Sequence, residues 1–292
     1  MDGILIINKP KGRTSHDIVA KVKRIVGNKV GHTGTLDPNA TGVLPLLIGK
    51  GTLCSQYLME HDKIYEVELK LGIRTDTADS EGNIIEEKVV DLENLCEKKV
   101  TEVLNSFLGK QEQIPPMYSA IKVNGKKLYE YARSGQNVEL KPRQIEIFSF
   151  ELKKINLQEK EICFKVHCSK GTYIRSLCED IAHKLDTVGY MKELNRVKVG
   201  KFGIEEAITI EELENNISNE DFLTQYFISI EKAFEYIKSI TIEENRLKHF
   251  FNGVKLSFNL EDGIYRVYDE NNNFIGIGSL KNKLLKREII LD

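Results

Sequence analysis

The chain has 292 residues, of which 41% are hydrophobic and 29% charged, and its formal net charge is −2. This composition is typical of a soluble globular protein with one large domain, or with one domain plus a small one, and it excludes a disordered chain. No apolar run approaches the roughly 20 residues that a membrane-spanning helix needs. Asp2 stands where a signal peptide carries basic residues. We therefore expect a cytoplasmic protein with no membrane association.

Five cysteines are present, an odd number without any Cys-x-x-Cys pair, so a disulfide framework is not expected. Cys163, His167 and Cys168 lie close enough in the sequence to suggest a zinc site. In an extended strand, however, Cys163 and Cys168 point to opposite faces, and no second ligand pair follows. Free thiols on a strand are therefore the favoured interpretation.

Charge is unevenly distributed along the chain. Residues 1–30 hold seven basic side chains against two acidic ones, residues 122–143 hold six against two, and acidic residues concentrate in 205–220. A protein that is acidic overall can therefore present one basic face to a polyanion. The alternative, ordinary solvated lysines, stays open at this point.

The predicted elements begin with a short strand over residues 4–7, closed by a turn at 8–12. Ser15 is the expected N-cap of an amphipathic helix that ends at Gly27. A glycine-rich loop at 31–42 follows this helix.

Beyond the loop, hydrophobic periodicity separates strands from helices. The expected elements are a strand over 65–71, turns at 76–83, a helix over 92–108, a strand over 162–168 and a helix over 174–185. Arg175 falls in the first turn of the last helix. This strand–loop–helix unit therefore presents a guanidinium where the loop enters the helix.

The segment 122–141 interleaves basic residues with tyrosines around a strong turn signal, Asn124-Gly125. Such a segment suits contact with a nucleic acid, because cations meet phosphates while rings stack on bases. A half-buried amphipathic helix explains the composition equally well. If the first interpretation holds, the candidate phosphate contacts are Lys9, Lys122, Lys126, Arg133 and Arg143.

Residues 237–292 change to short β-like pieces at 255–258, 263–268 and 274–278, separated by Asn, Asp and Gly turns. The change predicts a large domain over 1–236 and a small β domain over 237–292, with a linker near 236–241.

The loop 31–42 holds one carboxylate, Asp37, among glycines, threonines and a proline, with His32 five residues before it. Pro38 keeps Asp37 out of the helical conformation, and glycines permit sharp turns and a close ligand. A lone acid here serves as a metal ligand, a general base or a nucleophile. No second carboxylate or histidine cluster nearby has metal-ligand spacing.

Two other chemistries fit the sequence poorly. The segment 42–51 has the wrong spacing for a phosphate-binding loop, and Gly51 stands where that loop requires Ser or Thr. A glycosidase needs two carboxyl groups. Asp76 and Asp79 lie in a turn that could supply one, but nothing in the sequence pairs them with Asp37.

The remaining interpretation uses Asp37 with Arg175 as its counter-ion. A neighbouring guanidinium keeps an aspartate ionised, and an ionised aspartate can attack or stabilise a sugar carbon that is losing its base. A base within folded RNA must first be extruded. Taken singly, a buried structural arginine and a solvated loop aspartate explain these two residues as well, so the residues alone leave the function open.

The sequence resembles the TruB family of tRNA pseudouridine synthases in six segments, in the family's order, over about the first 200 residues. No single segment is specific, but the set is. The segments are residues 8–15 (NKPKGRTS), 31–45 (GHTGTLDPNATGVLP), 63–65 (KIY), 74–79 (RTDTAD), 115–120 (PPMYSA) and 169–175 (SKGTYIR).

The resemblance implies conversion of uridine 55 to pseudouridine in the T-loop of tRNA, without cofactor or metal. Asp37 matches the catalytic aspartate and Arg175 the arginine that pairs with it. Tyr65 matches the tyrosine that stacks on the target base and is implicated in removal of the C5 proton. The remaining matches are His32, which occupies the vacated stack, and Tyr173 and Leu194, which line the pocket.

The family fold is α+β, with a mixed, largely antiparallel central sheet, flanking helices and a small PUA-like C-terminal β domain. By the same resemblance, the segment 122–141 corresponds to a thumb-like insertion that closes over the T-loop, and the expected partner is the T-arm of tRNA. We expect a monomer without an obligate protein partner. One departure is Asn195, which replaces the first of two consecutive basic residues after Leu194, and we expect weaker phosphate contact there.

Three alternatives belong to other classes of function. The pocket could serve RNA binding or folding alone, the enzyme could be an N-glycosylase that releases free base, or the chain could belong to the guide-RNA-dependent branch of the superfamily. The short chain, without long basic extensions, disfavours the last.

Overall fold

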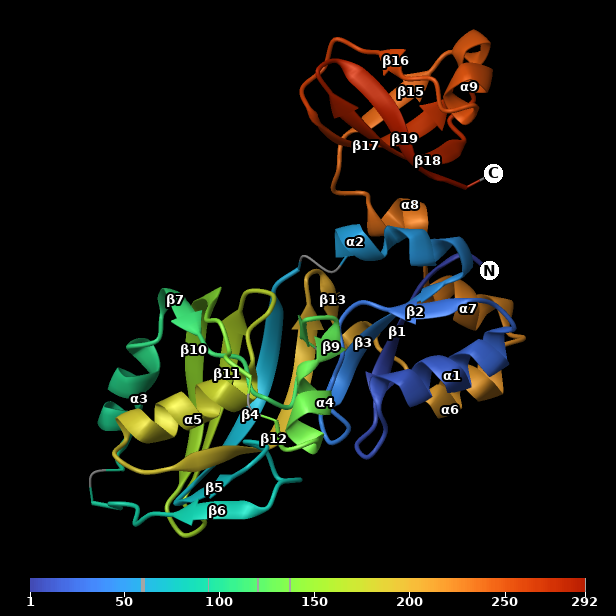
Figure 1. The fold of residues 1–292 in the computed structure, drawn as a ribbon. Coiled ribbons are helices and arrows are strands. Elements are labelled where there is room, and N and C mark those ends of the chain that lie inside the picture. The colour runs from blue at the N-terminus through green and yellow to red at the C-terminus, as the bar shows by residue number, and fades with distance from the viewer. Residues whose placement is uncertain (59–60, 94, 120, 137, 292) are drawn as a thin grey trace.

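The structure is a computed structural model. It describes residues 1–58, 61–93, 95–119, 121–136 and 138–291, apart from the side chain of Arg133. Residues 94, 120 and 137, which fall in predicted segments, lie outside this part. Figure 1 shows a large sheet flanked by helices and a smaller β unit at the C-terminal end. No helix within the described residues is both long and apolar enough to cross a membrane.

The large sheet has ten strands, in the order β14-β1-β3-β12-β4-β11-β10-β7, with β2 paired to β3 and β13 to β12. In the half of the sheet that contains the N-terminal strand, all strand pairs are antiparallel. The strands of this half are β1 (Gly3–Lys9), β2 (Val30–His32), β3 (Thr41–Ile48) and β14 (Phe227–Ser229). The helices of this half are α1 (Ser15–Val26), α6 (Ile210–Asn216) and α7 (Glu220–Tyr226).

The other half is also antiparallel. Its strands are β4 (Lys63–Leu71), β7 (Gly109–Gln113), β10 (Arg143–Asn156), β11 (Glu161–Cys168), β12 (Gly189–Val199) and β13 (Phe202–Gly203). Helices α3 (Glu97–Asn105) and α5 (Ile174–Lys184) bury their apolar faces against one face of these strands.

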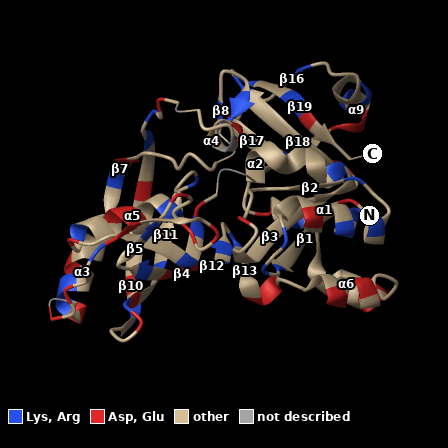
Figure 2. Cartoon of the chain, turned by 60° about the horizontal axis from the view of Figure 1, so that its bottom comes forward, with Lys and Arg blue, Asp and Glu red and all other residues tan. Residues whose placement is uncertain are grey.

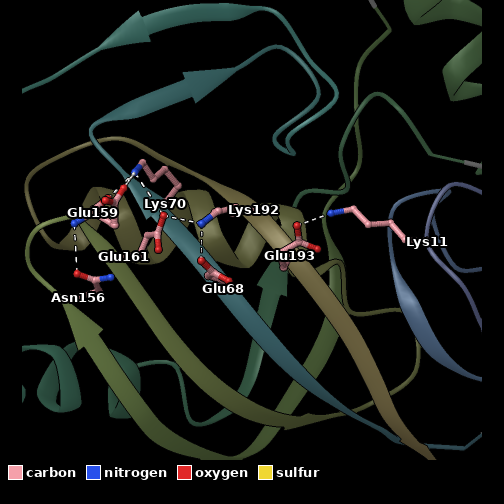
Figure 3. A network of polar contacts seen from close by, with 8 residues as sticks. All are labelled: Lys11, Glu68, Lys70, Asn156, Glu159, Glu161, Lys192 and Glu193. Carbon is pink, nitrogen blue, oxygen red and sulfur yellow. Dashed lines mark hydrogen bonds and ion pairs between the residues drawn. The ribbon is translucent and has the colours of Figure 1, made fainter.

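The opposite face of β4, β11 and β12 is polar and carries a network of ion pairs (Figure 3). Lys192 contacts Glu68 at 2.6 Å and Glu161 at 2.7 Å, and Lys70 contacts Glu161 at 3.3 Å and Glu159 at 3.7 Å. An antiparallel sheet with one face in the core and one in solvent gives this alternation along each strand.

The two halves meet where β12 runs parallel to β3, with Asn195 opposite Thr41 and Arg196 opposite Gly42. Gly42 has φ +101°, and a Cβ there would lie 2.3 Å from the Arg196 carbonyl oxygen. The junction therefore requires glycine at this position. The loop that carries Asp37 ends here, so the seam between the half-sheets positions that loop.

Several short elements lie outside the two main sheets. They are η1 (Gly49–Cys54), α2 (Ser55–Leu58), β5 (Ile73–Thr75), β6 (Ile84–Glu87), β8 (Lys122–Val123), β9 (Lys126–Lys127), α4 (Leu128–Arg133) and η2 (Ile204–Glu206). Asn124 and Gly125 both have positive φ and form the tight turn between β8 and β9, as the sequence predicts.

The C-terminal unit is a five-stranded sheet in the order β15-β17-β18-β19-β16, with β15 parallel to β17. It comprises β15 (Ser239–Ile242), α9 (Glu244–Phe251), β16 (Leu256–Ser257), β17 (Gly263–Asp269), β18 (Phe274–Lys281) and β19 (Leu284–Ile290). Ile277 and Ile289 share a core with Phe234, which follows α8 (Ile230–Ala233), and with Leu58 of α2. The small unit therefore packs on the large one.

The predicted fold class, a mixed and largely antiparallel sheet with flanking helices and a small C-terminal β domain, is confirmed. The N-cap of α1 was predicted wrongly. Thr14 caps the helix in a capping box with Asp17, while the Ser15 hydroxyl bonds to Leu36 instead. Gly27 ends the helix as predicted, in the left-handed conformation.

Candidate active site

The Asp37 loop is held by main-chain contacts on both sides of the aspartate. The Ser15 hydroxyl donates to the Leu36 carbonyl at 3.0 Å and accepts from the Leu36 N–H at 2.8 Å. The Pro38 carbonyl accepts from Lys9 Nζ at 2.8 Å and from the Gly12 N–H at 3.0 Å. The conformation of the loop is therefore fixed by neighbouring segments before any substrate arrives.

The structure brings Arg175 against Asp37. Arg175 Nε lies 3.2 Å from Asp37 Oδ2, and Nη2 lies 3.4 Å from Oδ1, so one edge of the guanidinium faces both carboxylate oxygens. The Tyr118 carbonyl accepts from Nη2 at 2.8 Å and the Thr77 carbonyl from Nη1 at 3.3 Å. With its side chain 7% exposed, Arg175 is a buried cation whose orientation the backbone sets.

Asp79 is a third member of this cluster that the sequence analysis did not connect to Asp37. Its Oδ2 lies 3.5 Å from Arg175 Nη1, and its Oδ1 accepts from Thr77 Oγ1 at 2.6 Å and from the Glu81 N–H at 3.1 Å. One guanidinium therefore serves two carboxylates. The segment 74–79 was noted in the sequence, but only the folded chain brings its last residue to α5.

Burial raises the pKa of Asp37 above the ordinary aspartate value, although its side chain is 37% exposed on the outer side. Arg175 opposes this effect, Asp79 adds to it, and Lys9 and Arg196 oppose it more weakly. Three cations therefore act on Asp37 together with Asp79, and Glu81, which is more exposed, belongs to the same cluster of charges.

An apolar wall stands beside the acid. Tyr65 on β4 and Leu194 on β12 are each 8% exposed and belong to the same core cluster as Leu36. Burial raises the pKa of the Tyr65 phenol to about 12, and the neighbouring Arg196 opposes this rise. At neutral pH the phenol is protonated and its ring offers a flat apolar surface.

Tyr173 and His32 lie at the ends of two elements. The main chain of Tyr173, the N-cap of α5, exchanges two hydrogen bonds with the Gln113 side chain, at 2.8 and 3.0 Å. His32 lies at the end of β2, and burial lowers its pKa. The His32 ring is therefore neutral at pH 7, and its Nδ1 has no hydrogen-bond partner within the described residues.

Of the predicted phosphate contacts, Lys122, Lys126 and Arg143 are exposed, the first two on the β8–β9 hairpin. Figure 2 shows basic residues in blue on strand β8. Lys126 lies over the Tyr131 ring at 5.2 Å. The side chain of Arg133 lies outside the described residues.

Lys9 differs from the expectation. It is fully buried and donates to the carbonyls of Pro10, Arg13 and Pro38, and burial lowers its pKa to about 8. Lys9 therefore supports the loop from inside rather than facing a phosphate.

The zinc alternative has no geometric support. Cys168 is buried in the core, whereas Cys163 is partly exposed on the polar face of the same strand. Within the part of the chain that is described, no three His, Cys, Asp or Glu side chains are placed to share a metal ion.

Comparison with known families decides the class of protein. The model of the TruB family pseudouridylate synthase N-terminal domain matches residues 22–174, and that of the tRNA pseudouridylate synthase B C-terminal domain matches 175–235. The chain belongs to the TruB family of pseudouridine synthases. A third model, for the C-terminal region of pseudouridine synthase II TruB, matches residues 239–286.

Full-length relatives of this TruB-family chain are named tRNA pseudouridine synthase B. The protein of Clostridium kluyveri is 46% identical over 97% of this chain and 96% of its own length. The protein of Caldanaerobacter subterraneus subsp. tengcongensis is 42% identical over 98% of each chain. The chain is therefore an isomerase of the pseudouridine synthase class, and the family predicted from the sequence is confirmed.

Solved structures show the same fold. Cbf5 in a Cbf5-Nop10-Gar1 complex has a TM-score of 0.73 and 25% identity over 99% of this chain and 84% of its own. An H/ACA RNP bound to a substrate RNA that contains 2′-deoxyuridine has a chain with a TM-score of 0.72 and 23% identity over 99% and 85% of the two chains.

Asn195, the departure from the family pattern, is bonded within the protein. Its Oδ1 accepts from Thr41 Oγ1 at 3.2 Å, and its Nδ2 donates to Glu66 Oε2 at 3.4 Å. The following residue, Arg196, is 1% exposed beneath the Asp37 loop. The sequence analysis gave Arg196 no role.

Proposed function

We propose that this enzyme isomerises uridine to pseudouridine in tRNA, at position 55 of the T-loop, on the bare tRNA and as a monomer. The observation that carries the proposal is the ion pair between Asp37 and Arg175, on a loop whose conformation neighbouring segments hold. The chain belongs to a family of pseudouridine synthases, which supports this use of the pair. The relatives' shared name supports tRNA as the substrate.

The target base must leave the RNA stack to reach Asp37. Tyr65 and Leu194 provide the apolar surface on which the everted uracil rests. His32 fills the vacated place in the stack, and its neutral ring suits that role because no unpaired charge enters the helix. The exposed lysines of the β8–β9 hairpin then meet the phosphates of the T-arm.

The ionised Asp37 carboxylate acts on the ribose, either by attack at C1′ or as a base at C2′. The glycosidic N1–C1′ bond breaks and the uracil turns within the pocket. A C5–C1′ bond forms, C5 loses its proton, and N1 gains one, so the mass of the RNA is unchanged. Arg175 favours the ionised form of Asp37, because its charge opposes the effect of burial on the pKa of this carboxyl group.

The test is incubation of the protein with an unmodified tRNA transcript, followed by mapping of pseudouridine and by mass spectrometry. We expect one pseudouridine, in the T-loop, at constant RNA mass. A transcript with cytidine at position 55 is the matched control and gains none. A lower RNA mass would indicate an N-glycosylase, and activity only with an added guide RNA would contradict action on bare tRNA.

The variant Asp37→Asn separates catalysis from RNA binding. We expect it to form no product while it binds the transcript with nearly unchanged affinity, because the amide keeps the shape of the side chain and loses the nucleophilic charge. Normal turnover by this variant would remove Asp37 from the mechanism. A pocket used for binding alone would leave wild-type protein without product as well.

A further inference from the structure

Arg196 lies at the seam of the two half-sheets, under the Asp37 loop, with 1% of its surface exposed. Its Nε donates to the Val43 carbonyl at 2.8 Å and its Nη2 to the Gly34 carbonyl at 3.1 Å. Both acceptors are neutral. In the described part of the chain, Arg196 forms no ion pair with an aspartate or glutamate, so its charge is not neutralised by a contacting partner.

Tyr65 is the cross-strand neighbour of Arg196. The two residues are directly opposite in the antiparallel pairing of β4 with β12, so their side chains emerge on the same face. The phenol of Tyr65 is buried, and the positive charge of Arg196 lowers the pKa of this phenol against the effect of burial. Arg175 is committed to Asp37 and Asp79, which leaves Arg196 as the cation next to Tyr65.

A buried cation without a contacting anion is costly unless the fold or the reaction uses its charge. Packing alone does not require that charge, because an apolar side chain of similar length fills the same space. An oxygen that becomes negative during the reaction would be stabilised by such a preorganised cation.

We propose that Arg196 is a positioning residue for Tyr65. It fixes the phenol oxygen beside C5 of the rotated uracil and stabilises that oxygen while it carries negative charge. The inference rests on the proposed function. In the step concerned, the Tyr65 phenol, which is protonated at rest, gives its proton to water. The phenolate takes the C5 proton, the C5–H electron pair forms the C5=C6 bond, and the N1=C6 pair moves to N1, which takes the proton back from water.

Two variants separate charge from packing. Arg196→Gln keeps an amide donor for a loop carbonyl but removes the charge, whereas Arg196→Lys keeps the charge. Lys198→Met, an exposed position on the same strand, is the matched control. Each is compared with wild type in single turnovers on transcripts with protium or deuterium at C5 of uridine, with thermal melting as the check on folding.

We expect Arg196→Gln to slow product formation by at least about tenfold, which is less than the roughly 10²- to 10⁴-fold loss expected on removal of a general base, because Tyr65 itself remains. Its tRNA affinity stays unchanged, and deuterium slows it further because C5 proton removal becomes limiting. Arg196→Lys lies between this variant and wild type in rate and in deuterium sensitivity. If Arg196→Gln does not fold, a deuterium-sensitive Arg196→Lys supports the proposal. Rate losses that are equal with both isotopes in every folded variant would overturn it.

A second measurement needs no RNA turnover, so it is independent of the proposed function. A fluorotyrosine at position 65 reports loss of the phenol proton through its ¹⁹F resonance. We expect this titration to move to higher pH in Arg196→Gln and to move less in Arg196→Lys, because the neighbouring positive charge favours the phenolate. Identical titrations in wild type and Arg196→Gln would overturn the proposal, whatever the outcome of the tRNA assay.

Discussion

Arg175 at the seam of the sheet is 7% exposed and shares its guanidinium between Asp37 and Asp79 and two main-chain carbonyls. Lys192, on the polar face of the same sheet, is 36% exposed and bonds to Glu68 and Glu161 (Figure 3). The first cation is held by two carboxylates and two main-chain carbonyls, and because it is buried it is screened little by water. The second is one of several mutually satisfied surface charges.

The difference decides which charges are available to a substrate. Around Asp37, three buried cations lie near Asp37, Asp79 and the more exposed Glu81. Within the described residues, two of these cations, Lys9 and Arg196, donate to main-chain carbonyls and form no ion pair. On the polar face, lysines and glutamates alternate and neutralise one another. The charges of the polar face neutralise one another and attract a polyanion only weakly. The buried charges at the seam are already oriented before the RNA binds.

The largest expected effect comes from removing the shared cation. Arg175→Met should lower the rate of product formation by about 10²- to 10³-fold, the range for loss of a preorganised charge in an active site. Because Arg175 opposes the raised pKa of Asp37, the acid limb of the pH–rate profile should also move to higher pH. Single-turnover rates across pH measure both. Arg175→Lys, which keeps the charge, should lose less, and an unshifted acid limb in Arg175→Met would contradict this account.

Asp79→Asn should change the same profile in the opposite direction. Asp79 adds to the raised pKa of Asp37, so its neutralisation should move the acid limb to lower pH. The rate should fall by about tenfold, because Arg175 loses one of the anchors that orient it. Asp76→Asn is the matched control, since Asp76 lies in the same turn and bonds to Asn83 instead. If the acid limb of the Asp79→Asn profile moved to higher pH, the charge of Asp79 would not be what raises the pKa of Asp37.

The sequence predicted the strands whose alternation is regular. Residues 65–71 and 162–168 correspond to β4 and β11, where one face is apolar and the other polar. Strands β10 and β12 were not predicted, because each contains register shifts that interrupt the alternation, in β12 between Met191 and Glu193 and between Arg196 and Lys198. The helix predicted over 92–108 is shorter in the structure, at Glu97–Asn105.

Only the part of the site that has a local sequence signal could be predicted. Asp37 stands out because its loop has no other acid and an unusual density of glycine and threonine. The sharing of Arg175 with Asp79 depends on contacts between segments 96 residues apart, which no local pattern encodes. Lys9 looks like a surface base in the sequence, yet it takes a core position at the end of β1 because three carbonyls converge on its ammonium.

A smaller effect is expected where the protein meets the RNA backbone. Lys122→Gln and Lys126→Gln should each weaken tRNA binding a few-fold and leave the rate at saturating tRNA unchanged. Removing one lysine that neutralises a phosphate should reduce the slope of log affinity against log salt by roughly 0.7 to 0.9. Lys153→Gln is the control, because Lys153 is already paired with Glu151. Equal salt slopes in all variants would show that the β8–β9 hairpin does not contact phosphates.

The smallest effect should come from breaking the polar-face network. Lys192→Met removes bonds to Glu68 and Glu161, yet Glu161 keeps Lys70 at 3.3 Å, and Lys192 is well exposed. We expect a loss of about 1 kcal/mol or less in the free energy of unfolding, shrinking as salt rises. Hydrogen bonds to Glu161 and Glu68 raise the pKa of Lys192, so its contribution is complete below the unfolded-state pKa of lysine and disappears as pH rises through the folded-state value. Chemical denaturation at two salt concentrations measures the loss. Activity should stay at the wild-type level, and a tenfold loss of activity would mean that the charges of the polar face and of the seam act as one system.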